Sequence, residues 1–118
     1  MRILITGSRD WDDQGLIADQ IHTAQFFYGE DLVVVHGSCP RGADQIADEW
    51  AAVLGIEVER HAADWDSLGR RAGFVRNAEM VALGADVCLA FIRNGSKGAT
   101  HCADLAEKAG IPVRRFLA

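Results

Sequence analysis

Residues 3–9 read Ile3-Leu4-Ile5-Thr6-Gly7-Ser8-Arg9, a short apolar run that ends in a turn marked by glycine. The arrangement recurs at Leu32-Val33-Val34-Val35 before His36-Gly37-Ser38, and at Val87-Cys88-Leu89-Ala90-Phe91 before Gly95-Ser96-Lys97-Gly98. In an open parallel sheet such turns lie at the carboxyl ends of the strands, where ligands bind, and they lead into helix N-termini whose free N–H groups favour anions. The three turns therefore predict a site for a ligand that carries phosphate.

Strand and helix patterns alternate along the whole chain. Strands are expected near residues 2–6, 32–36, 56–60, 85–92 and 112–116, and helices near 13–28, 42–54, 70–83 and 98–109. Residues 32–35 and 87–91 are continuously apolar, which is typical of strands covered on both faces. We therefore expect an α/β fold, a Rossmann-like three-layer sandwich with a mostly parallel, about five-stranded sheet.

Composition limits the classes of function. The 118 residues, 49% of them hydrophobic, fit one domain over residues 1–118, with no linker or internal repeat. A net charge of -5 argues against nucleic acid as a partner, since binding a phosphate backbone normally needs a basic face. The sequence lacks an apolar stretch of membrane-spanning length and a signal-peptide pattern, so we expect a cytoplasmic protein with no membrane contact.

Metal and disulfide patterns are missing as well. Cys39, Cys88 and Cys102 contain no CxxC pair, so neither a disulfide framework nor a zinc site is indicated. The segment 61–66 holds one histidine and two aspartates, but their spacing fits no standard ligand pattern. We expect neither a metal nor a cofactor.

The first turn offers three groups to a ligand. Gly7 lets the backbone approach it, Ser8 supplies a hydroxyl, and Arg9 can make a bidentate contact with phosphate or carboxylate. The alternative is a plain glycine turn in which Asp10 or Asp12 caps the following helix. An aromatic residue at position 11 is more typical of packing than of base stacking.

The second turn frames a hydroxyl and a guanidinium between glycines. This turn, with Gly37, Ser38 and Arg41, precedes an amphipathic helix. No Gly-Lys-Ser/Thr sequence closes it, which argues against a nucleoside triphosphatase of the Walker A type. Asp44, in the first turn of that helix, is either a dipole-favoured residue or a functional carboxylate. His36 at the strand end is either a hydrogen-bonded structural residue or a ligand contact.

A third element places a cation beside an apolar side chain. Arg76 and Met80 stand four residues apart on one helix face, next to Asn77, which suits a nucleotide or a sugar phosphate. The alternative is an exposed arginine above a core methionine. Arg70 and Arg71, slightly upstream, are expected to be solvated.

The fourth element is a loop that leads into a helix. Gly95, Gly98 and Ala99 offer backbone N–H groups to a phosphate, with Thr100 in the first helical turn. Cys102 could be a reactive thiol near a helix N-terminus, although packing is the favoured interpretation because no base is fixed beside it.

Taken in order, these motifs cover nearly the whole chain. They are Ile5-Thr6-Gly7-Ser8-Arg9-Asp10-Trp11, His36-Gly37, Arg41-Gly42-Ala43-Asp44, Ala63-Asp64-Trp65, Ala72-Gly73, Arg76-Asn77, Met80 and Gly95 to Thr100. As an ordered set they resemble the YspA-related branch of the SLOG superfamily, small proteins of bacteria and their phages. The resemblance implies a Rossmann-like domain that binds nucleotides or nucleotide-derived ligands at the strand carboxyl ends, often as a homodimer.

The same superfamily includes the DNA-processing DprA proteins and the LOG phosphoribohydrolases, which cleave the N-glycosidic bond of nucleoside monophosphates. LOG enzymes carry an arginine in a motif similar to Arg76 to Met80, and a glutamate three residues past a Gly-Thr pair. Aligning Gly98-Ala99 on that pair puts Cys102 where the glutamate belongs. A neutral thiol supplies no carboxylate to stabilise an oxocarbenium-like transition state or to activate water. The remaining candidates for catalysis are Arg76, Glu79, Asp44 and Asp104.

The first hypothesis is binding of a nucleotide or a nucleotide-derived small molecule, for example one like ADP-ribose, without required catalysis. The alternative is a nucleoside 5'-monophosphate phosphoribohydrolase of the LOG type. Single-stranded DNA binding of the DprA type is disfavoured, because the chain is acidic and lacks a basic stripe interleaved with aromatics. The expected ligand-binding residues are Gly7, Ser8, Arg9, Gly37, Ser38, Arg41, Asp44, Arg76, Asn77, Gly95, Gly98, Ala99 and Thr100.

Overall fold

One five-stranded sheet organises the chain, in the order β3-β2-β1-β4-β5. The computed structural model describes all residues, 1–118. All four strand pairings are parallel, so the expected α/β class is confirmed and the sheet is wholly rather than mostly parallel. The strands are β1 (Arg2–Gly7), β2 (Val33–His36), β3 (Glu57–Arg60), β4 (Val87–Ile92) and β5 (Val113–Leu117).

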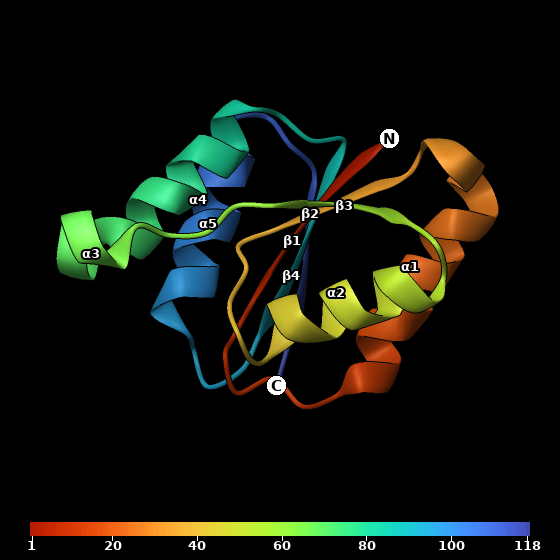
Figure 1. Ribbon diagram of the computed structural model, residues 1–118, viewed down its shortest axis with the longest axis horizontal. Coiled ribbons are helices and arrows are strands. Elements are labelled where there is room, and N and C mark those ends of the chain that lie inside the picture. Colours follow the sequence, from red (N-terminus) through yellow and green to blue (C-terminus); the bar gives the residue numbers. More distant parts are fainter.

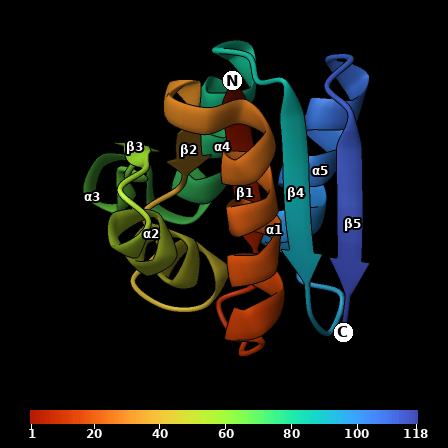
Figure 2. The same ribbon diagram turned by 90° about the vertical axis from the view of Figure 1, so that its right-hand side faces the viewer.

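Helices cover both faces of the sheet. Figure 1 shows the strands nearly edge-on, with α1 (Gln14–Tyr28) and α2 (Ala43–Val53) on one side and α4 (Ala72–Ala82) and α5 (Lys97–Lys108) on the other. Figure 2 shows β4 and β5 pointing the same way, with β5 at one edge of the sheet. Parallel neighbours need crossover helices, and covering both faces gives the three layers that the sequence predicts.

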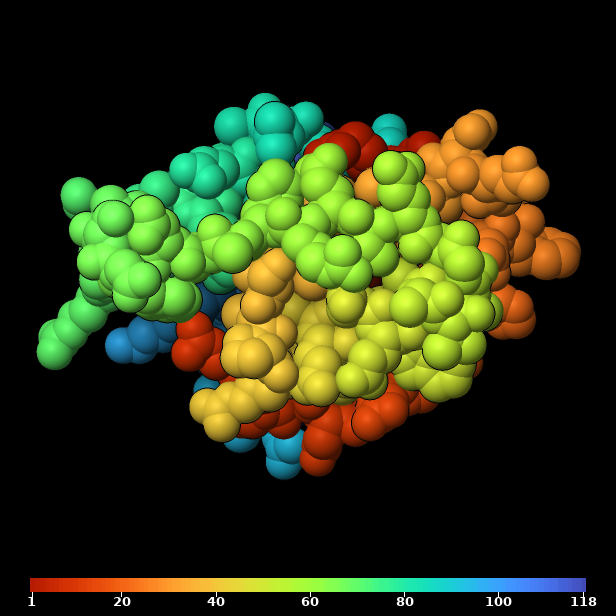
Figure 3. Space-filling model, in the orientation of Figure 1, coloured from red at the N-terminus to blue at the C-terminus, as the bar shows by residue number.

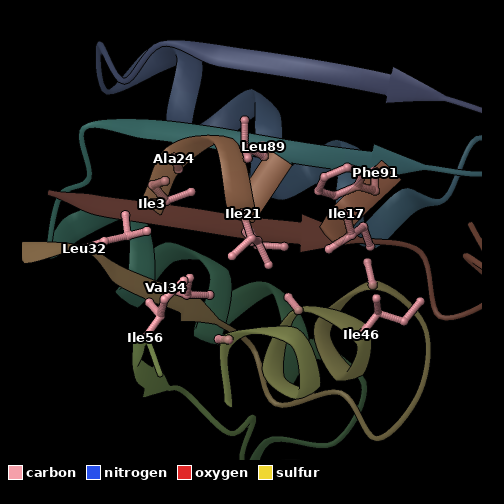
Figure 4. Packing of buried hydrophobic residues seen from close by; sticks show 14 of the residues in the cluster. Ile3, Ile17, Ile21, Ala24, Leu32, Val34, Ile46, Ile56, Leu89 and Phe91 are labelled. Atoms are coloured by element: carbon pink, nitrogen blue, oxygen red, sulfur yellow. The ribbon is translucent and has the colours of Figure 1, made fainter. Parts of the chain in front are cut away.

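Alternation along β1 divides the core into two layers. Ile3 and Ile5 face α1 and α2, where they join a cluster that includes Ile17, Ile21 and Phe91 (Figure 4). Leu4 faces the other way and packs with residues of α4 and α5, including Met80 and Cys102. Both faces of the central strands are therefore buried, which explains why residues 32–35 and 87–91 are continuously apolar.

Three short elements are absent from the sequence-based prediction. The short helix α3 (Trp65–Leu68) and the 3-10 turn η2 (Gly69–Arg71) precede α4, whereas the sequence predicts a single helix from about residue 70. Asp64 caps α3, since its Oδ1 accepts the Ser67 N–H at 3.1 Å. A second 3-10 turn, η1 (Gly29–Asp31), follows α1. None of the helices is both long and apolar enough to cross a membrane.

The carboxyl ends of all five strands lie at the same edge of the sheet. Two glycines allow the backbone to pack closely there. A Cβ atom on Gly7 would lie 2.8 Å from the Phe91 carbonyl oxygen and against the Ala43 side chain. Gly42 has a φ of 78° and lies against the backbone of Ser8 and Arg9. The first and second turns are therefore packed directly on each other, which fixes the floor of the carboxyl edge.

Candidate functional site

A cleft of about 510 Å³ opens at the carboxyl edge of the sheet. Four segments that lie far apart in the sequence line it: residues 6–10, 37–44, 65–80 and 96–99. In Figure 3 the corresponding red, gold, green and blue surfaces meet beside the α3 region, which projects from the body of the molecule. The site thus occupies the position where ligands bind in open α/β sheets.

The cleft is positive although the chain is negative. Its lining contains Arg9, Arg41, Arg70 and Arg76, but only two carboxylates, those of Asp10 and Asp44. The whole chain carries a net charge of -5. Cations are thus concentrated at one place, which favours an anionic ligand there and raises its local concentration.

Arg76 is the buried cation of the cleft. Its side chain is held in place by Nε, which donates to Asn77 Oδ1 at 3.0 Å, and by Nη1, which donates to the Gly37 carbonyl oxygen. No carboxylate lies within ion-pair distance of it, and Nη2 makes no hydrogen bond within the protein although it retains solvent contact. Buried charges are normally paired, so a guanidinium left without a counterion is suited to bind an anion.

Asp44 is buried in the same cleft and only half satisfied. The residue is 5% exposed, and Oδ2 accepts the Cys39 N–H at 3.3 Å. Oδ1 has no partner, and it is the only buried side-chain oxygen or nitrogen in the chain without one. Burial raises the pKa of this carboxyl, although His36, the Cys39 N–H and Arg76 act in the opposite direction.

The N-terminus of α5 closes one side of the cleft. The Thr100 N–H makes the first hydrogen bond of this helix, to the Ser96 carbonyl oxygen at 3.1 Å. The preceding N–H groups, including those of Gly98 and Ala99, therefore have no partner within the helix. Asn77 Nδ2 donates to the Gly98 carbonyl at 3.2 Å and thereby ties α4 to this turn. Free N–H groups and the positive end of the helix dipole therefore border the same space as Arg76.

Two partly exposed aromatic side chains line the cleft. Trp65 is 47% exposed and Phe74 is 44% exposed, and both line the cleft. The Arg9 guanidinium lies 5.4 Å from the centre of the Trp65 ring. Gly73 lets the indole approach α4, because a Cβ atom there would lie 3.3 Å from it. Flat apolar faces beside cations suit a ligand that has a planar ring as well as a charge.

Comparisons with known proteins identify the family of the chain. The family described as "YspA, cpYpsA-related SLOG family" matches residues 1–67. The chain belongs to this SLOG family. It is also 50% identical over 124 residues to the "Gene 61 protein" of Mycobacterium phage D29, an alignment that covers 98% of this chain and 95% of the phage protein. No solved structure matches the chain significantly.

The cleft of this SLOG chain brings together most of the residues expected from the sequence. Those in its lining are Gly7, Arg9, Gly37, Arg41, Asp44, Arg76, Asn77, Gly98 and Ala99. Four expected residues do not line it: Ser8, Ser38, Gly95 and Thr100. Membership in the SLOG family supports a ligand related to nucleotides as the general class.

Ser8 is absent from the lining because the fold uses its hydroxyl. The Oγ atom accepts the Arg93 N–H at 2.7 Å and lies 3.2 Å from the Arg93 carbonyl oxygen, to which it donates. Ser8 is 1% exposed. Its role in the structure is to join the first turn to the end of β4.

His36 is likewise occupied inside the protein. Nδ1 accepts the Ser38 N–H at 2.9 Å and so carries no proton, and Nε2 then donates to Asp48 Oδ1 at 2.9 Å. Of the two interpretations open from the sequence, the structural one holds. Partial burial raises the pKa of Asp48, but hydrogen bonds from His36 and Arg60 outweigh it and leave that pKa below its usual value.

Two of the four catalytic candidates lie outside the cleft. Glu79 is exposed on α4 and does not line it. Asp104 is exposed on α5, where Oδ1 accepts from Arg115 at 2.8 Å. Both sit on helix faces turned away from the sheet edge, so only Arg76 and Asp44 remain as groups that a ligand in the cleft could contact.

Cys102 and Trp11 belong to the core. Cys102 is fully buried, and burial raises the pKa of its thiol to about 11, so it is not the activated thiol considered above. Trp11 packs edge-on against Phe91 with ring centroids 5.4 Å apart. The cap of α1 is Asp13, whose Oδ1 accepts the Leu16 N–H, rather than Asp10 or Asp12.

Several lining residues are not among the expected ones. Trp65 lies in α3, Arg70 in η2 and Phe74 in α4. The four residues of α3 are too few to show a helical period. Arg70 is exposed, as expected, but it lines the cleft while Arg71 does not. The sequence signal that could have found Trp65 is Asp64 directly before it, a residue type that caps helices and here marks a short helical turn upstream of the Arg76 helix.

Proposed function

We propose that this protein binds a nucleotide or a nucleotide-derived molecule in the cleft at the carboxyl edge of its sheet. The observation that carries the proposal is Arg76, a buried guanidinium without a counterion, beside the free N–H groups of α5. An anionic group of the ligand, such as a phosphate, completes the hydrogen bonding of both. Family membership supports the same ligand class.

The base is assigned to the aromatic end of the cleft. Trp65 and Phe74 are partly exposed in the cleft, and Arg9 lies over the Trp65 ring, where it can contact the base or the phosphate of the same ligand. Stacking on an aromatic side chain contributes about 1–3 kcal/mol per base. A ligand with a phosphate and a planar base therefore uses both features, whereas inorganic phosphate uses only the first.

A thermal-shift screen tests the proposal. The protein is mixed with nucleoside mono-, di- and triphosphates, ADP-ribose, NAD and inorganic phosphate, and the midpoint of unfolding is recorded for each. A saturable rise with at least one nucleotide, larger than that with phosphate, is expected. If none of these compounds moves the midpoint, the proposal is wrong.

Adjacent arginines provide a matched pair for locating the site. Arg70 and Arg71 are both exposed and make no hydrogen bond within the protein, but only Arg70 lines the cleft. Arg70→Ala is expected to weaken binding by about threefold, the size of one exposed charge contact, and Arg71→Ala by less. Equal effects of the two substitutions would place the ligand elsewhere.

Hydrolysis of the N-glycosidic bond is a second candidate, favoured by the position of Asp44. This buried carboxyl shares the cleft with Arg76, and a carboxylate beside a bound nucleotide could assist attack of water on the ribose carbon. In that reaction water adds to the carbon as the bond to the base breaks, and the base leaves with a proton. Chromatography of each screening mixture distinguishes the candidates, since free base appears only with hydrolysis.

A further inference from the structure

Asp44 raises a question that ligand binding at Arg76 alone does not answer. A buried polar atom without a partner costs free energy, and the chain contains one such side-chain atom, Asp44 Oδ1. The other oxygen of the same carboxylate has a partner, the Cys39 N–H. The unsatisfied oxygen belongs to a residue in the cleft lining, so a bound ligand can supply the hydrogen bond that the protein does not.

The position of this oxygen relative to Arg76 restricts the ligand. Arg76 Nη1 is held by the carbonyl of Gly37, and Asp44 is held by the N–H of Cys39. Two residues of chain span at most about 7 Å, so one short loop sets both groups at neighbouring places in the cleft. A ligand that satisfies both presents an anion and, a few bonds away, a hydrogen-bond donor.

The chemistry of Asp44 selects a hydroxyl as that donor. An ionised carboxylate oxygen only accepts hydrogen bonds, so the missing partner is a donor, and a hydroxyl is a neutral donor that nucleotides carry near the phosphate. The χ2 torsion of an aspartate is broad, so the carboxylate can rotate to meet a ligand in the cleft without a backbone movement. In nucleotides, the hydroxyls a few bonds from the phosphate are those of the ribose.

We propose that Asp44 accepts a hydrogen bond from a ribose hydroxyl of the ligand, so that the cleft takes ribonucleotides in preference to their deoxy counterparts. The inference rests on the proposed function, because it assumes that the anion at Arg76 is the phosphate of a nucleotide. It makes Asp44 a residue that determines specificity for the sugar.

The experiment compares three probes by calorimetric titration: 5'-AMP, 2'-deoxy-5'-AMP and 3'-deoxy-5'-AMP. In the unaltered protein, at least one deoxy compound is expected to bind about tenfold more weakly than 5'-AMP, the equivalent of one hydrogen bond to a charged group. Asp44→Asn is expected to reduce that discrimination to about twofold or less. Asp19→Asn, the same change at an exposed position on α1, controls for the loss of charge and should keep the full discrimination.

The stability of the free Asp44→Asn protein is the second readout. An amide oxygen can still accept the Cys39 N–H, and the substitution removes a buried carboxyl that lacks a partner. Its unfolding midpoint is therefore expected to stay the same or rise. A clear fall would mean that Asp44 has a structural role, and the inference would be wrong.

The binding outcomes separate this inference from the proposed function. Equal affinity of the unaltered protein for all three probes would overturn the sugar assignment while leaving nucleotide binding in place. Discrimination that persists unchanged in Asp44→Asn would also overturn it. Absence of binding by all three probes, together with a flat thermal-shift screen, would overturn the proposed function and this inference with it.

Discussion

Gly37→Ala tests whether the buried arginine is built into the fold as described. A Cβ atom at position 37 would lie 2.6 Å from Arg76 Nη1 and 2.7 Å from Cζ, closer than such atoms approach in proteins. The backbone at Gly37 does not have a positive φ, so the substitution introduces no backbone strain of its own. The added methyl group therefore acts on one side chain, the guanidinium of Arg76.

The size of the effect follows from the contact that is lost. Arg76 must leave the Gly37 carbonyl, which removes a hydrogen bond from a charged donor at a buried position. Such a bond contributes about 1.5–3 kcal/mol, and a displaced guanidinium regains some hydration, so we expect a loss of about 2 kcal/mol of unfolding free energy. For a chain of 118 residues this lowers the unfolding midpoint by about 8 °C.

Binding should fall together with stability. The substitution changes no charged group of the chain but displaces Arg76, the proposed anion contact, so the affinity for 5'-AMP is expected to drop at least tenfold. Gly15→Ala is the control, since the nearest atom to its Cβ would be 3.6 Å away and the position lies in the first turn of α1. It should raise the midpoint slightly and leave binding unchanged. If Gly37→Ala matches the unaltered protein in both measurements, the position assigned to Arg76 is wrong.

Three further changes probe the remainder of the structure. Glu59→Gln should lower the free energy of unfolding by about 1 kcal/mol near pH 7 after allowance for exposure, because the hydrogen bonds from Arg2 lower the pKa of Glu59 to about 2. This difference should vanish as the pH falls from 4.5 toward 2, and denaturant titrations at several pH values would measure it. Gly7→Ala should destabilise the fold by about 1–3 kcal/mol through overpacking against Ala43, measured by urea unfolding. Cys88, whose thiol pKa burial raises to about 12, should resist iodoacetamide at pH 8 unless the protein unfolds, which mass spectrometry of the labelled protein would detect.

The position of the candidate site at the carboxyl edge of the sheet can be predicted, because the sequence patterns that indicate it are local. Apolar runs that end at glycine define both the strands and the edge of the sheet at which their turns lie. Asp44 follows from its place in the first turn of α2, and Arg76 from the helix face that it shares with Met80. Parallel strands all deliver their carboxyl ends to one edge. The meeting of residues from four distant segments in one cleft is therefore a consequence of topology, which the sequence pattern carries.

What the sequence could not predict depends on contacts between distant residues. The Ser8 hydroxyl bonds to the backbone of Arg93, and nothing near Ser8 in the sequence indicates that partner. The place of Trp65 depends on a four-residue helix without periodicity and on the space that Gly73 leaves for its ring. Glu79 is close to Arg76 in the sequence, but only one face of α4 reaches the cleft. Glu79 is exposed and does not line it.

The arrangement of α4 explains how the ligand site depends on the whole fold. Arg76 and Asn77 are consecutive, yet Arg76 bonds to the loop after β2 and Asn77 bonds to the turn before α5. One turn of α4 thus contacts both the loop after β2 and the loop after β4, and these two strands lie on either side of β1. A ligand at this point contacts groups whose positions exist only when both connections are docked, so its binding energy adds to the stability of the sheet edge as a unit. Because the same two residues hold the loops and face the ligand, loosening either loop removes the anion site before it unfolds the core.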